Sequence, residues 1–200
     1  MSTNIHTIGD SHSIQPWKYI PNIVNHHIDR CLAYSVGRDG LDRLNIKLYD
    51  DIKEGDIVIF SFGEIDCRCH INRFITETKS YQNIIADIVD KYIKVIKLNL
   101  NIIDKNLTVG IFNIVPPQKL PYPENPEFPF RGSSSERLNY VKQFNFDLKQ
   151  HCDNEDFTFI DIDDKYADKD GFLNTKYSDG HVHIADPIFL IKYLKELNWI

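Results

Sequence analysis

Short apolar runs alternate along this chain with longer segments in which apolar residues recur every three or four positions. The clearest short runs are Ile57 to Phe62 and Leu107 to Val115, and both are apolar at successive positions. Continuous runs of this kind are typical of central parallel strands, which are covered on both faces. A shorter run from Ile5 to Ile8, which stops at Gly9, predicts a further strand near the start of the chain.

The longest periodic segment lies between Ser80 and Asp104. Its apolar residues fall on one stripe, with aspartates and lysines off it, so it predicts a helix that crosses over against the sheet. A second helix is expected from Ser133, a capping residue followed by an early acid, to about His151. Pro187 should begin a final helix, and Leu41 to Tyr49 should form a short amphipathic one.

Two more strands complete the expected sheet. Arg30 to Val36 predicts the second strand, and Phe157 to Ile162, which alternates more, predicts an edge strand. The segment 14–27 holds Pro16 and Pro21 and is expected to be irregular. Because strands and helices alternate, we predict a three-layer α/β/α sandwich, flavodoxin-like, with a mainly parallel five-stranded sheet. At 200 residues, the chain is most simply one domain, 1–200.

Small and polar residues follow several of these predicted strands. They form four segments, which are Gly9-Asp10-Ser11, the end of the second strand at Gly37, Gly63-Glu64-Ile65-Asp66, and Asp179-Gly180-His181-Val182-His183. Reactive groups in open α/β sheets lie just past the carboxyl ends of the strands, so Ser11 should stand in a crevice there. A Gly-Asp-Ser run alone also makes ordinary turns. The interpretation of Ser11 as a reactive residue therefore depends on all four segments together.

These four segments, in this order, resemble the four sequence blocks of the SGNH/GDSL hydrolases. The resemblance implies that Ser11 is a nucleophile and that the late segment supplies an Asp–His pair. Family members separate that Asp and His by two residues, whereas one residue separates Asp179 from His181 and three separate it from His183. We favour His183 as the base, because its apolar neighbours would anchor the ring. The alternative is that both are exposed loop histidines.

The third segment departs from the family pattern. Ile65 stands where the family has an asparagine that donates to the oxyanion, and an isoleucine side chain has no donor. The backbone N–H groups of Ser11 and Gly37 would then bind the oxyanion, with the guanidinium of Arg68 stabilising the developing charge. Equally, Glu64, Asp66 and Arg68 could form a buried ion-pair network that only shapes the loop.

The resemblance implies a serine-dependent hydrolase or acyltransferase that acts on a small O-acyl ester, with a carbohydrate ester favoured. The competing hypothesis is a non-catalytic module of the same fold that binds a glycan or a protein, for which the missing asparagine is the warning sign. A proline-rich segment, 116–130, is too long for a mere connector. It is either a surface loop packed on its own rings or a wall of the substrate cleft.

Charge and composition narrow the other possibilities. The formal net charge is −6 with no basic patch, so neither nucleic acid nor an anionic membrane is expected as a partner. No apolar signal segment or run of about 20 apolar residues occurs, which favours a cytoplasmic protein. The four cysteines suggest no disulfide framework and are expected to be reduced. The oligomeric state stays open.

No cofactor or metal is expected. Cys67, Cys69 and His70 are close in sequence, but they lack a second clear pair of ligands, and zinc needs three or four. His12 should not serve as the base of Ser11, because adjacent side chains diverge. His26 and His27 are expected to face solvent.

Overall fold

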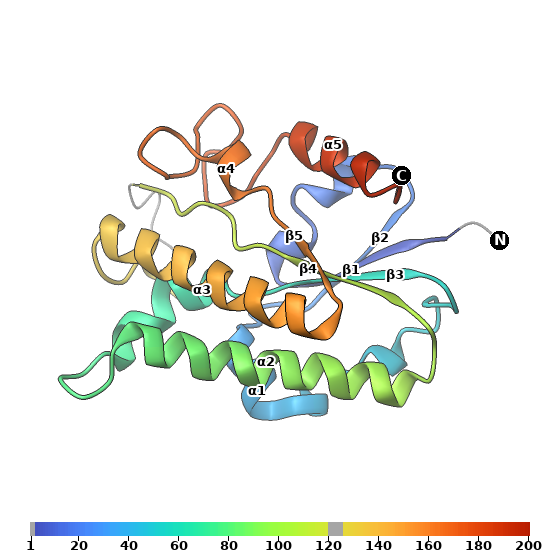
Figure 1. Cartoon of the computed structure of the whole chain (residues 1–200). Helices are drawn as coiled ribbons and strands as arrows, with labels where there is room; N and C mark the ends of the chain where they lie inside the picture. The colour runs from blue at the N-terminus through green and yellow to red at the C-terminus, as the bar shows by residue number, and fades with distance from the viewer. Residues whose placement is uncertain (1–2, 120–125) are drawn as a thin grey trace.

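Five parallel strands form one sheet in the order β2-β1-β3-β4-β5 (Figure 1). The computed structural model describes residues 3–119 and 126–200. The strands are β1 (Ile5–Gly9), β2 (Ile23–His27), β3 (Ile57–Ser61), β4 (Thr108–Phe112) and β5 (Thr158–Ile160). All five residues of β3 are buried, as its continuous apolar run predicts. The predicted α/β fold with a parallel five-stranded sheet is therefore confirmed.

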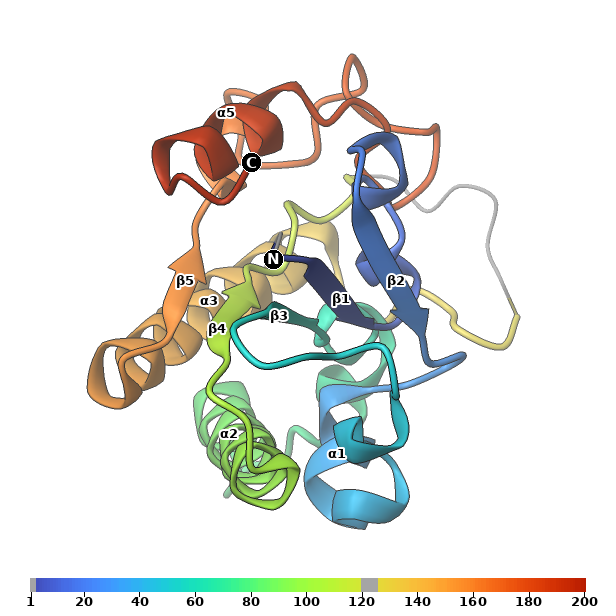
Figure 2. The same cartoon turned by 90° about the vertical axis from the view of Figure 1, so that its right-hand side faces the viewer.

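Helices cover both faces of the sheet, and Figure 2 shows the layers. On one face lie α1 (Ala33–Asp39), α2 (Tyr81–Ile103) and α3 (Ser134–Glu155), which share a core with Ile8, Phe60 and Ile111. On the other face lie α4 (Asp163–Tyr166) and α5 (Ile188–Glu196), which pack around Trp17 and Phe112. Within the described residues, no helix is long and apolar enough to cross a membrane.

The predicted long helices begin at their capping residues, and α3 continues to Glu155, past its expected end near His151. The side chain of Ser80 accepts the N–H of Asn83 at the start of α2. Ser133 and Glu136 form a reciprocal capping box at the start of α3. Both helices end at an aspartate in the left-handed conformation, Asp104 and Asp156. These local signals lie within a few residues of the helix ends.

The prediction for Arg30 to Val36 is wrong, since Ala33–Asp39 is the helix α1. The carboxylate of Asp66 accepts the N–H groups of Ala33 and Tyr34, at 2.7 and 3.1 Å, and so caps this helix from a distant loop. The second strand lies earlier, as β2, in a segment that was expected to be irregular. Leu41 to Tyr49 likewise forms two short 3-10 turns instead of one helix.

Candidate active site

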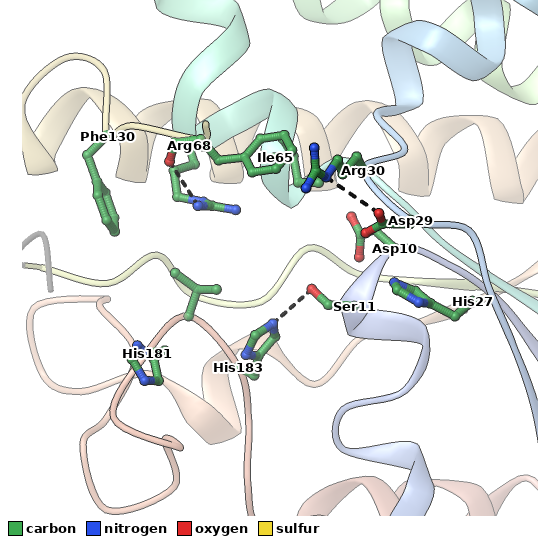
Figure 3. A pocket seen from close by; sticks show the side chains of 12 residues that line it. Asp10, Ser11, His27, Asp29, Arg30, Ile65, Arg68, Phe130, His181 and His183 are labelled. Atoms are coloured by element: carbon green, nitrogen blue, oxygen red, sulfur yellow. Dashed lines mark hydrogen bonds and ion pairs between the residues drawn. The ribbon is translucent and has the colours of Figure 1, made fainter. Parts of the chain in front are cut away.

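Ser11 lies at the carboxyl end of β1, where the chain turns away from the sheet. The turn needs Gly9, because a Cβ atom at that position would lie 2.0 Å from the carbonyl oxygen of Ser61 on β3. Asp10 then caps a 3-10 turn over Ser11–Ser13, with its side chain accepting the N–H of His12 at 2.8 Å. The hydroxyl of Ser11 is thereby held at the sheet edge (Figure 3).

The side chains of Ser11, His183 and Asp179 form a continuous hydrogen-bonded chain. The Oγ of Ser11 lies 2.8 Å from Nε2 of His183, and Nδ1 of His183 lies 2.8 Å from Oδ2 of Asp179. Because a carboxylate only accepts, Nδ1 carries the ring proton and Nε2 presents its lone pair to the hydroxyl. This is the geometry in which a histidine can take a serine proton.

The loop that carries His183 is fixed by its own carboxylate. Asp179 also accepts the backbone N–H groups of His181 and His183, at 2.8 and 3.3 Å. The next residue, Ile184, is fully buried and pairs with Ser178 across the loop. Although partial burial raises it, the pKa of Asp179 stays below its usual value because of the hydrogen bonds from His183 and the loop backbone. Asp179 is therefore charged at neutral pH.

His183 and His181 differ in what they face. Burial, assisted by the nearby His12, lowers the pKa of His183, although Asp179 opposes the shift. His183 is therefore neutral and able to accept a proton at pH 7. His181 is exposed and lines the mouth of the cavity (Figure 3). The geometry places His183, and not His181, within hydrogen-bond reach of Ser11.

A cavity of about 280 Å³ opens above Ser11 and His183. Phe128 and Phe130, from the proline-rich segment, form part of its wall, so the described part of that segment lines the cavity; its residues 120–125 lie outside the described residues. The other residues that line it come from four regions of the chain: Asp10, His27, Asp29, Arg30, Ile65, Arg68, His181 and Val182.

No family model and no curated protein sequence matches the chain. A Streptococcus pneumonia protein named for platelet activating factor superposes with a TM-score of 0.67 at 16% identity, over 98% of this chain and 84% of its own. A GDSL-like lipase from Bacteroides thetaiotaomicron superposes with a TM-score of 0.61 at 12% identity, over 98% of this chain and 87% of its own.

A catalytic serine-to-alanine mutant of an acetylxylan esterase from Geobacillus stearothermophilus gives a TM-score of 0.58 at 12% identity, over 100% of this chain and 97% of its own. This chain has the SGNH/GDSL hydrolase fold. The resemblance drawn from the four sequence segments is confirmed at the level of that fold. At identities of 12–16%, these matches show the fold and do not show the substrate.

Gly37 does not take the position in this SGNH/GDSL fold that the sequence suggested. It lies in α1 and packs on α2, where a Cβ atom would lie 2.8 Å from Cβ of Lys91. The expected role of its N–H in an oxyanion site is therefore wrong, because the residue faces a helix instead of the cavity. The carboxyl end of β2 and the segment after it approach the cavity instead, through His27, Asp29 and Arg30.

Arg68 does reach the cavity, and its charge is balanced by Glu64. The guanidinium contacts both carboxylate oxygens of Glu64, at 2.9 to 3.1 Å, and donates to the carbonyl of Phe128 at 3.1 Å. Both side chains are largely buried, and although burial opposes ionisation, Arg68 keeps the pKa of Glu64 below its usual value. Asp66 instead turns toward α1, so the expected three-residue network contains only the Glu64–Arg68 pair.

Several residues of this site gave no signal in the sequence. Phe128 and Phe130 were visible only as members of an aromatic segment. Arg30 lay in a misassigned strand, and Asp29 lay just before it. His12 was not expected to act as the base, yet it contacts the site: its ring centroid lies 4.8 Å from that of His183. Cys67 and Cys69 do not converge on His70, because the thiol of Cys69 donates to the carbonyl of Ile65 and His70 packs on Tyr34. The four cysteines are free thiols.

Proposed function

We propose that this chain is a serine-dependent hydrolase of small O-acyl esters, with Ser11 as nucleophile, His183 as general base and Asp179 as its orienting acid. The observation that supports this most directly is the chain of two 2.8 Å hydrogen bonds from Ser11 through His183 to Asp179, which opens into a cavity. Three residues that lie up to 172 positions apart meet there in the order that acyl transfer requires.

In the proposed reaction, Nε2 of His183 takes the proton of Ser11 as Oγ attacks the acyl carbonyl carbon. The tetrahedral intermediate then expels the alcohol oxygen, which receives that proton from Nε2 and leaves. A water molecule, deprotonated by the same nitrogen, attacks the acyl-serine, and the carboxylic acid departs as Ser11 regains its proton. Asp179 holds the tautomer and stabilises the imidazolium throughout.

Charge on the intermediate would be stabilised by the backbone N–H of Ser11 and by Arg68 at the cavity wall. Because Ile65 supplies no side-chain donor in this region, stabilisation of the intermediate would depend more strongly on the charge of Arg68. The cavity of about 280 Å³ suits a short acyl group better than a long chain. An acetylated carbohydrate is our favoured substrate, supported by the acetylxylan esterase among the structures of similar fold. Transfer of the acyl group to a second alcohol uses the same steps with that alcohol in place of water.

The test is covalent labelling by a fluorophosphonate probe together with turnover of p-nitrophenyl acetate. We expect wild type to be labelled at Ser11 and to turn over the ester, and Ser11→Ala to lose both. Ser135→Ala, at an exposed position in the first turn of α3, is the matched control and should behave as wild type. Absence of both labelling and turnover in folded wild type would contradict the enzyme proposal.

Ile65 favours one other function, a non-catalytic module that binds a glycan or a protein in the same cavity. Removal of one oxyanion donor slows related chemistry by about 100- to 1000-fold, so a site without it has weaker support as an enzyme. Glycan-array binding by Ser11→Ala and by wild type to the same degree, without turnover by either, would support this alternative.

A further inference from the structure

A second cluster of titratable side chains lies at the β2 edge of the sheet, apart from the proposed active site. His6 on β1 and His26 on β2 point to the same face, because Ile8, two residues after His6, is in register with His26. The planes of their imidazole rings are inclined by only 17°, with centroids 5.3 Å apart, and the two rings meet at their nitrogen edges. His26 was expected to face solvent, but its side chain is only 9% exposed.

Three ligand atoms converge in this cluster. Nδ1 of His6 lies 3.0 Å from Nε2 of His26, and Nε2 of His26 lies 3.7 Å from Oδ2 of Asp51. The three ligand atoms, one each from His6, His26 and Asp51, all lie within 4.8 Å of one another. A tetrahedral zinc ion with bonds of about 2.0–2.2 Å holds its ligand atoms about 3.3 Å apart. The two distances given above, 3.0 and 3.7 Å, lie just below and just above this ligand-to-ligand distance.

The lone pair of His6 is directed into the cluster by a buried carboxylate behind it. Nε2 of His6 lies 3.2 Å from Oδ2 of Asp56, so this nitrogen carries the proton and Nδ1 is left as the ligand atom. Asp56 is itself fixed, because it accepts the backbone N–H groups of Asn4 and Lys53, at 2.9 and 2.7 Å. Metal-binding histidines almost always have such a carboxylate or carbonyl behind the ring.

The surroundings leave one side of the cluster open. The ring of Tyr49 packs on His26, with centroids 4.2 Å apart, and closes one side. Asp51 has a side chain that is 52% exposed, so water reaches the cluster from that direction. Three protein ligands with a fourth position open to water is a common arrangement of zinc in proteins. Imidazole and carboxylate ligands also suit copper and nickel, which would compete.

We propose that His6, His26 and Asp51 bind one zinc ion, with water as the fourth ligand and with Asp56 orienting His6. The ion would take the position of the proton that Nε2 of His26 donates to His6, and His26 would then carry its one ring proton on Nδ1, exchanged through solvent, so that both imidazoles stay neutral. It would join the edge strand β2 to β1 and to the loop that carries Asp51. This site is independent of the Ser11 chemistry.

The test measures zinc directly, without reference to activity. The full chain is stripped with a chelator, desalted and titrated with zinc sulfate by calorimetry, and the bound metal is counted by mass spectrometry. We expect one zinc per chain with micromolar affinity or better, and a rise in Tm when zinc is added. X-ray absorption at the zinc edge should show two imidazole ligands together with oxygen.

Matched variants then locate the ion. His26→Gln should abolish binding, and Asp51→Asn should weaken it at least tenfold, whereas His151→Gln and Asp50→Asn should leave it unchanged. His183→Ala should also bind zinc as wild type does, which separates this site from the histidine of the proposed triad. Since Asp51 is exposed, its variant should fold, with circular dichroism as the check.

Two outcomes would overturn the proposal. One is the absence of zinc binding at 0.1 mM metal, about a hundredfold above the micromolar Kd expected, where such a site would be almost fully occupied. The other is zinc binding that survives both His26→Gln and Asp51→Asn. In either case, the contact between His6 and His26 is a structural hydrogen bond.

Discussion

The ring of His12 lies against the ring of His183, with centroids 4.8 Å apart and planes inclined by 45°. Both nitrogens of His12 face acceptors, since Nδ1 lies 3.2 Å from Asp10 and Nε2 lies 3.2 Å from the carbonyl of Val182. Two acceptors favour the doubly protonated ring. Although burial opposes it, the hydrogen bond and charge of Asp10 raise the pKa of His12 above 6.5. The proposed base therefore has a cation beside it.

Removal of that cation should shift the pH dependence of the reaction. Burial and His12 together lower the pKa of His183, so His12→Gln should raise that pKa. Since His183 acts as a base only when it is neutral, the rising limb of kcat/KM against pH should move to higher pH in the variant. The measurement is the pH–rate profile for p-nitrophenyl acetate. A limb that moves to lower pH would contradict this electrostatic assignment.

The two loop histidines should respond differently to substitution. His183→Ala should lower kcat by several orders of magnitude, as the loss of a triad member does, because no other group lies within reach of the Ser11 proton among the hydrogen bonds described. His181→Ala should change kcat only modestly, since this residue lines the cavity mouth. Steady-state kinetics on both variants separate the roles. A larger effect at His181 would reverse the assignment.

Arg68 should contribute to the chemical step and not only to the loop. Arg68→Lys keeps a positive charge opposite Glu64 but loses the forked guanidinium that contacts both carboxylate oxygens. The position of the charge relative to the cavity therefore changes. We expect kcat to fall about tenfold with little change in KM, as for an interaction made in the transition state. Arg73→Lys, at an exposed position, is the control. A lower Tm with unchanged kcat would instead support the purely structural alternative.

Asp66 should stabilise the fold from inside it. Asp66→Ala leaves the N–H groups of Ala33 and Tyr34 without their acceptor, and we expect the free energy of unfolding to fall by about 1–3 kcal/mol. Asp66→Asn should cost less, because its amide oxygen can still accept one of them. Urea denaturation measures both. Equal stability of wild type and the alanine variant would mean that α1 needs no cap.

The same residue makes stability depend on pH. Burial, the largest influence, raises the pKa of Asp66 to about 7, although the two backbone N–H groups oppose the shift. The folded state therefore holds this proton up to about pH 7, whereas an unfolded chain loses it near about pH 3.9. The contribution of the side chain to stability should thus fall as pH rises between these values. The advantage of wild type over Asp66→Asn should narrow over the same range.

The elements that the sequence predicted best are those whose own residues carry a local pattern or a capping signal. The stripe of α2, the capping box of α3 and the continuous apolar run of β3 need no knowledge of the rest of the chain. The assignment of α1 failed because its cap, Asp66, lies 33 positions from Ala33. β2 was missed because its second half, Asn25 to His27, is polar, and its histidine partner lies on β1.

The residues of the candidate site likewise include some with a local sequence signal and others without one. Ser11 could be predicted from a strand that ends at Gly9, and His183 from its apolar neighbours. The contacts of Phe128, Arg30 and His12 with the cavity or with His183 depend on how distant loops meet, which no local pattern records. The single-domain organisation, the cytoplasmic location and the oligomeric state stay predictions.

The hydrogen bond between Ser11 and His183 joins residues 172 positions apart, and this separation has a consequence during synthesis. Ser11 leaves the ribosome while the segment that carries its base is still untranslated. At about 5–20 residues per second, the serine waits for roughly 10–35 seconds without a base. In that interval β1 can pair with β2 and β3, but the nascent hydroxyl is no more nucleophilic than that of any other serine. The proposed reactivity therefore begins only after all five strands of the sheet have been made.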